Sequence, residues 1–138
     1  TPCRIGCNAG SEEMIMETRS LVSVVDDDES VRESLPDLLK EFGFAAMAFS
    51  SAEEFLASDS LVKTRCLILD IAMPGMSGPD LQKVLALRRQ SMPIVFITAS
   101  SDKSVRPRLL KEGAAECLFK PFSDTELQDA LKTALKVN

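Results

Sequence analysis

Short runs of large aliphatic residues alternate along the chain with longer segments in which apolar residues recur every three or four positions. Most of the runs are rich in Val, Ile and Leu, and residues 67–69 include no polar position. A strand with one solvated face would alternate apolar and polar residues, so an unbroken run predicts a strand buried on both faces. We therefore predict five strands, at residues 21–25, 44–49, 66–70, 93–97 and 115–119.

The segments between these runs have the apolar spacing of helices, which we expect to begin near residues 28, 51, 79, 107 and 124. For the first helix, Asp28 and Ser30 are both candidate N-caps. Ser30 with Glu33 also fits a capping box, and Gly43 is a natural end. Pro36 would remove a hydrogen bond inside this helix, so we expect a kink or a late start. Five strands alternating with five helices predict an α/β fold with a doubly wound, five-stranded parallel sheet, (βα)5.

Polar side chains follow four of the predicted strands at their carboxyl ends: Asp26, Asp27, Asp70, Thr98 and Lys120. The carboxyl ends of parallel strands meet at one edge of the sheet, where open α/β sheets bind their ligands. Each residue also has a purely structural interpretation. Asp70 would cap the turn before Pro74, Thr98 would be an ordinary strand end, and Lys120 would be a solvated lysine.

Length and net charge limit the classes of function that the chain can have. The chain has 138 residues, enough for one domain with a real core, and a net charge of -5, which argues against a nucleic-acid-binding surface. This charge does not exclude a nucleic-acid-binding domain beyond Asn138. No apolar run approaches the ~20 residues of a membrane helix, and no signal peptide is evident, so we predict a soluble cytoplasmic protein. Residues 1–20 lack periodicity and are expected to form a flexible leader; residues 21–138 form the domain.

Cysteine and histidine usage narrows the chemistry. A four-ligand zinc site is improbable, because the chain has no His and because Cys66 and Cys117 lie in apolar strands. Without His, the chain cannot carry a phosphohistidine of its own. Several carboxylates at one edge repel one another, and a divalent cation relieves this repulsion. An oxygen-only ligand set suits Mg²⁺.

Four motifs occur in order at compatible separations: the acids 26–28, Asp70 with residues 73–78, Thr98 with Ala99, and Lys120 with residues 121–122. Together they resemble the receiver domain of two-component response regulators, over almost the whole span 21–138. The details are most similar to receivers attached to helix-turn-helix DNA-binding domains. The resemblance implies a flavodoxin-like sheet with strand order 2-1-3-4-5.

The resemblance also implies the roles of the site residues. Asp70 would accept a phosphoryl group from a phosphohistidine on a sensor histidine kinase. Asp27, Asp70 and the Ala72 carbonyl would bind Mg²⁺ directly, and Asp26 would bind it through water. Asp28 would belong to the helix cap instead. Lys120 would neutralise the phosphoryl oxygens and Thr98 would offer them its hydroxyl, moving inward after transfer.

Two departures from the family pattern concern the switch. The position three before the lysine is usually aromatic, and its ring turns on activation, but here it is Cys117. We therefore expect a switch that does not depend on a ring. Pro107 lies in the helix that normally moves, so we expect an irregular or mobile stretch over 100–108.

Two further expectations follow from the resemblance. The Lys120–Pro121 bond should be cis. Self-dephosphorylation should be slow, because Ala72 and Ser100, two residues beyond Asp70 and Thr98, carry no acid or amide to orient a water.

Several alternatives stay open. A flavin-binding flavodoxin-like protein would need a phosphate loop after the first strand, where three aspartates stand instead. A metal-dependent phosphatase would want an acid at Ala72. A receiver-like interaction module would bind partners without phosphorylation. For a true receiver, we expect a phosphorylation-dependent homodimer or an effector to contact the surface of the fourth helix, last strand and last helix, and DNA to be bound only by a separate output domain.

Overall fold

The computed structural model describes residues 19–136, which contain one five-stranded parallel sheet of order β2-β1-β3-β4-β5. The strands are β1 (Leu21–Val25), β2 (Ala45–Phe49), β3 (Thr64–Asp70), β4 (Ile94–Thr98) and β5 (Glu116–Phe119). The predicted α/β fold, its (βα)5 arrangement and its strand order are confirmed. The predicted leader lies outside the described residues, apart from residues 19 and 20.

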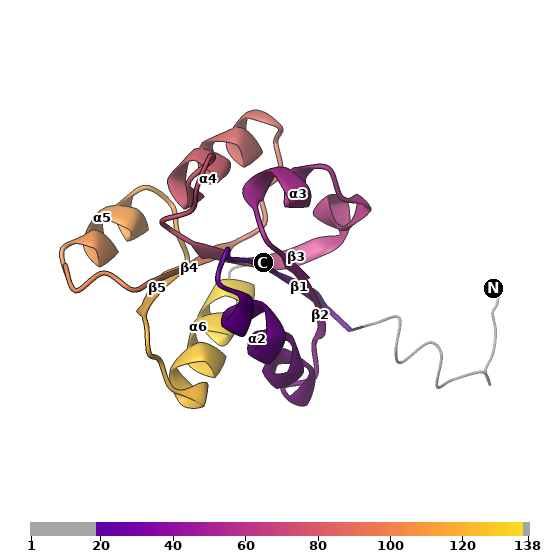
Figure 1. Ribbon diagram of the computed structural model, residues 1–138. Helices are drawn as coiled ribbons and strands as arrows, with labels where there is room; N and C mark the ends of the chain where they lie inside the picture. The colour runs from indigo at the N-terminus through magenta and orange to yellow at the C-terminus, as the bar shows by residue number, and fades with distance from the viewer. Residues whose placement is uncertain (1–18, 137–138) are drawn as a thin grey trace, which may run out of the picture.

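Helices cover both faces of the sheet (Figure 1). Two of them, α2 and α6, pack on one face, and the other three α-helices pack on the opposite face. The helices are α2 (Glu29–Glu41), α3 (Ala52–Leu56), α4 (Gly78–Leu87), α5 (Val105–Lys111) and α6 (Asp124–Lys136), with a short 3-10 helix η1 (Asp59–Lys63) after α3. We did not predict η1, whose start is capped by Ser58.

Side chains of the central strand divide between two core clusters. Leu67 and Leu69 of β3 pack with α3, α4 and α5, whereas Cys66 and Ile68 pack with α2 and α6. Successive side chains of a strand point to opposite faces, so a strand covered on both sides must be apolar throughout. This explains why the run 66–69 lacks polar residues. No helix between residues 19 and 136 has the length and apolar character needed to cross a bilayer.

Asp28, and not Ser30, caps helix α2. The Asp28 carboxylate accepts hydrogen bonds from the backbone N–H of Ser30 at 3.0 Å and from its hydroxyl at 2.8 Å. The predicted capping box of Ser30 and Glu33 is therefore wrong, since Ser30 already lies within the helix. Gly43 ends the helix as predicted, with a φ of +98° that suits glycine.

The two helix prolines have different consequences. Helix α2 begins seven residues before Pro36 and continues past it, so the late start was wrong, and the kink stays a prediction. Helix α5 begins at Val105, so residues 105–108 are helical and the expected irregular stretch is shorter than predicted. Pro107 lies in the first turn of α5. Residues of the first turn make no hydrogen bond through their N–H within the helix, so a proline, which lacks this group, does not break the helix there. The Lys120–Pro121 bond is cis, as expected.

Candidate functional site

Three carboxylates meet at the carboxyl edge of the sheet. Asp26 and Asp27 directly follow β1, and Asp70 ends the neighbouring parallel strand β3. One carboxylate oxygen from each residue can be chosen so that all three lie within 4.8 Å of one another. Asp26 is fully buried and Asp70 nearly so, whereas Asp27 is exposed. The cluster therefore has one face open to solvent.

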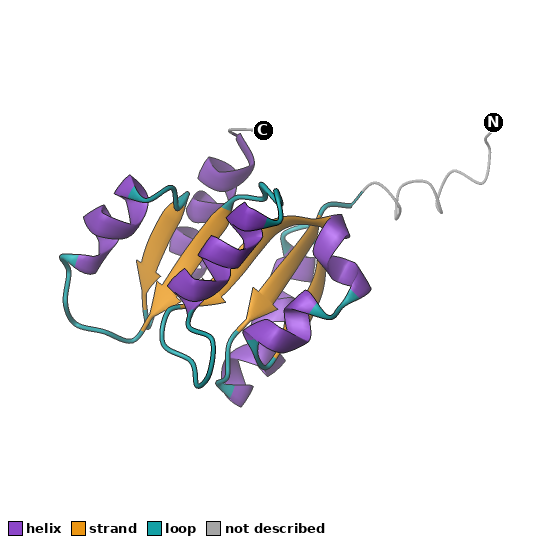
Figure 2. Cartoon of the chain, turned by 90° about the horizontal axis from the view of Figure 1, so that it is seen from above, coloured by secondary structure: helices purple, strands orange, loops and turns teal. Residues whose placement is uncertain are grey.

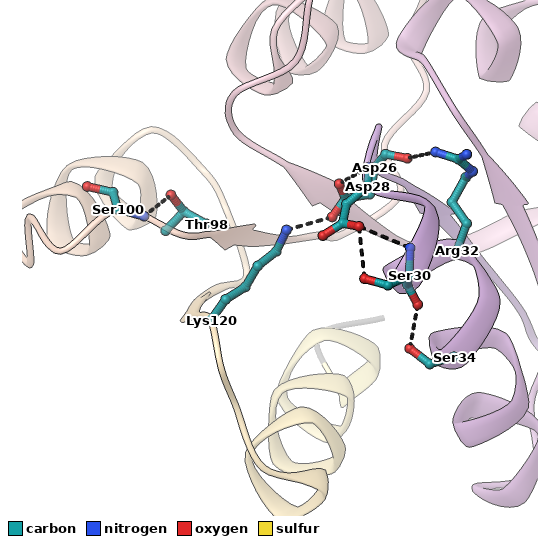
Figure 3. Close-up of polar contacts among 8 residues, drawn as sticks. All are labelled: Asp26, Asp28, Ser30, Arg32, Ser34, Thr98, Ser100 and Lys120. Atoms are coloured by element: carbon teal, nitrogen blue, oxygen red, sulfur yellow. Dashed lines mark hydrogen bonds and ion pairs between the residues drawn. The ribbon is translucent and has the colours of Figure 1, made fainter.

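Lys120 supplies the positive charge of the site. It follows the edge strand β5, and its Nζ lies 2.9 Å from Oδ2 of Asp26 (Figure 3). Burial alone would lower the pKa of Lys120. The hydrogen bond to Asp26 and the charges of Asp26 and Asp70 outweigh burial and raise the pKa above its usual value. Lys120 is therefore an ammonium group across the physiological range.

The pKa of Asp70 is raised to about 7. Burial is the main cause, and the negative charge of Asp26 adds to it, while Lys120 opposes the shift. The cluster thus contains more negative charge than one lysine neutralises. Carboxylate oxygens with no His or Cys among them are the donors that a hard divalent cation such as Mg²⁺ prefers, so the described residues fit such an ion.

Two hydrogen bonds, one to its carboxylate and one to its carbonyl, hold Asp26 in place. Its Oδ1 accepts a hydrogen bond of 2.9 Å from the N–H of Asp28, and its carbonyl accepts one of 3.0 Å from Nη1 of Arg32. Figure 3 shows the Arg32 guanidinium beside Asp26. The role of Arg32 was not predicted from the sequence, because an arginine in the first turns of an amphipathic helix has the pattern of an ordinary solvated residue.

Thr98 lies at the same edge but makes a different contact. It ends β4 and is 4% exposed, and its Oγ1 accepts a hydrogen bond of 3.0 Å from the N–H of Ser100. In Figure 3 the Thr98 hydroxyl is directed to Ser100 and away from Lys120. The structure therefore brings Asp26, Asp27, Asp70 and Lys120 together and places Thr98 beside them with its hydroxyl bound to the following loop.

Two other residues named from the sequence lie around this cluster. Ala72 is exposed in the loop after β3. Cys117 is buried in β5 and packs in the core cluster on the side of α3, α4 and α5.

The loop after Asp70 is fixed by close packing. The N–H of Gly78 donates a 2.9 Å hydrogen bond to the Ile71 carbonyl. A Cβ added to Gly78 would collide with the carbonyl oxygen of Asp70. Ser77 caps α4 in a reciprocal capping box with Asp80. Gly78 thus lets the start of α4 approach the strand end that carries Asp70.

The sequence of this chain matches the family model described as "Response regulator receiver domain" over residues 22–132. It is 44% identical over 117 residues to Nodulation protein W of Bradyrhizobium diazoefficiens, covering 85% of this chain and 52% of that protein. It is 36% identical over 136 residues to Response regulator protein TodT of Pseudomonas putida, covering 99% and 60%. The chain therefore spans about half to three fifths of the length of these relatives.

Two solved structures are also similar to this chain. The response regulator StyR superposes with a TM-score of 0.79 at 45% identity, covering 88% of this chain and 61% of that one. The structure titled FixJ-N superposes with a TM-score of 0.76 at 36% identity, covering 86% and 95%.

Replacing Gly78 with Ala should destabilise the protein by about 1–3 kcal/mol, because the new methyl group would collide with the Asp70 backbone. Gly→Ala inside a helix ordinarily stabilises by roughly 0.5–1 kcal/mol, so the expected sign is the reverse of the usual one. Urea unfolding followed by circular dichroism would measure the change. An unchanged or increased midpoint would contradict the close approach.

Replacing Asp70 with Asn should stabilise the metal-free protein at pH 8. The raised pKa means that folding opposes ionisation of Asp70, so this cost is absent below the unfolded pKa near 3.8, grows as pH rises, and is complete above about 7. Asparagine resembles the neutral acid and removes the cost. After allowance for partial exposure, we expect a gain of about 2 kcal/mol at pH 8 and little gain near pH 4.

Urea unfolding in EDTA at both pH values would test this, with Asp37→Asn, an exposed carboxylate of α2, as the matched control. Adding magnesium at pH 8 should stabilise the wild type more than Asp70→Asn. If Asp70→Asn and Asp37→Asn raised the free energy of unfolding equally at pH 8 in EDTA, a specific repulsion at Asp70 would be refuted.

Proposed function

Because the chain belongs to the response regulator receiver domain family, we propose that it is the phosphoacceptor of a two-component pathway and that Asp70 takes a phosphoryl group from a partner histidine kinase. The observation that carries this proposal is the convergence of Asp26, Asp27 and Asp70 within 4.8 Å, beside an ammonium group 2.9 Å from Asp26. This is a nucleophilic carboxylate beside groups able to neutralise a phosphoryl group.

In the proposed step, a carboxylate oxygen of Asp70 attacks the phosphorus of a phosphohistidine on the kinase. The new O–P bond forms while the P–N bond breaks, and the imidazole nitrogen keeps the electron pair. Phosphoryl transfer depends mainly on positioning and charge stabilisation. Lys120 would contribute its ammonium charge to the transferred oxygens, and Asp26 would keep that ammonium at the site through their ion pair.

We assign Mg²⁺ binding to Asp27, Asp70 and the Ala72 carbonyl, with Asp26 acting through water. When bound, the ion supplies positive charge that the cluster of carboxylates lacks. Asp28 is excluded from this set, because its side chain is occupied as the cap of α2.

Thr98 connects the site to the rest of the domain in this proposal. Its hydroxyl points to Ser100 and away from Lys120, so reaching a phosphoryl oxygen beside Lys120 would turn the side chain and disturb its contact with the Ser100 N–H. The loop that begins there leads into α5. Lys103 in this loop lies 3.9 Å from the ring centroid of Phe119, and Arg106 pairs with Glu116 at 2.6 Å. A change at Thr98 would therefore reach the contacts that α5 and the loop before it make with β5.

The output surface would be the face formed by α5, β5 and α6. A groove of about 550 Å³ opens there, bordered by Arg106, Cys117 and residues of α6. We propose that phosphorylation changes this surface and controls a homodimer or an effector. Several relatives are named transcriptional regulatory proteins, among them TdiR and FixJ. We propose a cytoplasmic regulator of transcription in which any DNA contact belongs to an output domain outside this chain.

Incubating the chain with acetyl phosphate and magnesium should add the mass of one phosphoryl group, detected by intact-mass spectrometry. Asp70→Asn should abolish the gain, and Lys120→Gln should slow it by roughly 10²-fold, since one charge-stabilising group is lost. Asp37→Asn is the matched control and should react like the wild type. Phosphoryl gain by Asp70→Asn, or none by the wild type, would overturn the proposal; the second result would favour a module that binds without phosphorylation.

Decay in the same samples after removal of acetyl phosphate tests the expected slow hydrolysis. Neither Ala72 nor Ser100 carries an acid or amide side chain that would orient an attacking water. A half-life of seconds with magnesium present would contradict this expectation.

Replacing Cys117 with Phe should leave phosphorylation-linked dimerisation unchanged if the switch does not use a ring. Cys117 is 2% exposed, so circular dichroism must first show that the larger side chain is accommodated. Cys117→Ala is the control that removes the thiol without adding a ring. Light scattering with and without acetyl phosphate would measure dimerisation. A large change specific to Phe would show that this position still governs the switch.

A further inference from the structure

A second pocket lies at the edge of the sheet opposite Asp70. It has a volume of about 340 Å³, and its lining includes Arg65, Arg89 and Val62. Arg65 stands near the beginning of β3, and Arg89 follows the end of α4. Figure 2 shows α4 running back against the strand direction, which brings its end to the edge where the strands begin. The pocket is therefore separate from the phosphoryl site.

The two segments that form this pocket are locally basic. Residues 60–69 contain Lys63 and Arg65 and no acid, and residues 81–93 contain Lys83, Arg88 and Arg89 and no acid. The whole chain, by contrast, has 21 acidic and 16 basic residues. The ion pairs found among residues 19–136 use other cations, so neither arginine of the pocket has a carboxylate within 4.0 Å there. Their guanidinium groups are available to an anionic ligand.

The backbone of Arg89 provides an independent observation. Its φ is +60°, and its N–H and the next one donate to carbonyls in the last turn of α4. Helices α2 and α5 end with the same hydrogen-bond pattern, but there the left-handed position is occupied by Gly43 and Gly113. Glycine adopts this conformation without the steric cost that a side chain incurs. An arginine at the third such helix end keeps a guanidinium at the pocket at the expense of stability, as functional residues often do.

We propose that this pocket binds an acidic peptide segment of a protein partner. Arg65 and Arg89 would pair with its carboxylates, and Val62, which is 73% exposed, would pack against an apolar side chain beside them. Arginine next to exposed apolar surface is a typical combination in protein interfaces. An inorganic anion would use the arginines but gain nothing from Val62. A nucleic acid is bound through many phosphate contacts, and the lining offers only two basic side chains, Arg65 and Arg89.

Fluorescence anisotropy of a labelled Glu-Glu-Leu-Glu-Glu peptide, titrated with the whole chain at about 20 mM salt to limit screening, tests the proposal. The wild type should bind, and Arg65→Gln or Arg89→Gln should each weaken binding about tenfold. Lys132→Gln, an exposed lysine of α6, is the matched control for charge and should have little effect. No binding by the wild type, or equal weakening by Lys132→Gln, would overturn the proposal.

Two further variants separate this site from the alternatives. Arg89→Gly should raise the unfolding midpoint and still weaken peptide binding, which a purely structural Arg89 would not do. Val62→Ser should weaken binding of the leucine peptide but not of the same peptide with Gly in place of Leu. If inorganic pyrophosphate binds at the arginines and Val62→Ser leaves peptide binding unchanged, the pocket is a small-anion site and the proposal is wrong.

Discussion

Crowded negative charge at the carboxyl edge of the sheet is the constraint on which the rest of the site depends. A buried carboxylate without compensation is costly, and Asp26 is fully buried. Lys120 reaches it from β5, and Arg32 and the N–H of Asp28 fix its orientation. These contacts compensate Asp26 but leave Asp70 with a raised pKa. Folding therefore opposes ionisation of Asp70, and a cation bound at this edge would remove that cost.

The three-layer fold, with helices on both faces of the sheet, confines this strain to one edge. Apolar side chains of β3 fill both core clusters, and the polar groups are confined to the end of the strand. Close packing of Gly78 against the Asp70 backbone then holds this strand end in one position. Rigid elements thus support the acids, while the groups proposed to respond, Thr98 and the loop after it, lie where regular structure stops.

The sequence was sufficient for the fold and for the cluster of acids, because both follow from topology. Once unbroken apolar runs indicate a parallel sheet, residues such as Asp26 and Asp70 must share an edge. Details that depend on side-chain torsions or local backbone were not predictable in this way. Examples are the Thr98 hydroxyl turned to Ser100, the choice of Asp28 as the cap, and the left-handed conformation of Arg89. Pro107 shows the same limit, since its effect depended on where α5 begins.

Helix α5 buries fewer side chains than any other α-helix of the domain. It has seven residues, and Leu109 is its one fully covered side chain, whereas α6 covers four. Short helices contribute little stability of their own, and elements with few buried contacts open locally at low free energy. Displacing α5 would uncover one side of its core cluster near β5, while the other helices still cover the central strands that carry the acids. The side of the domain that is easiest to open therefore lies at β5, away from the strand that ends in Asp70.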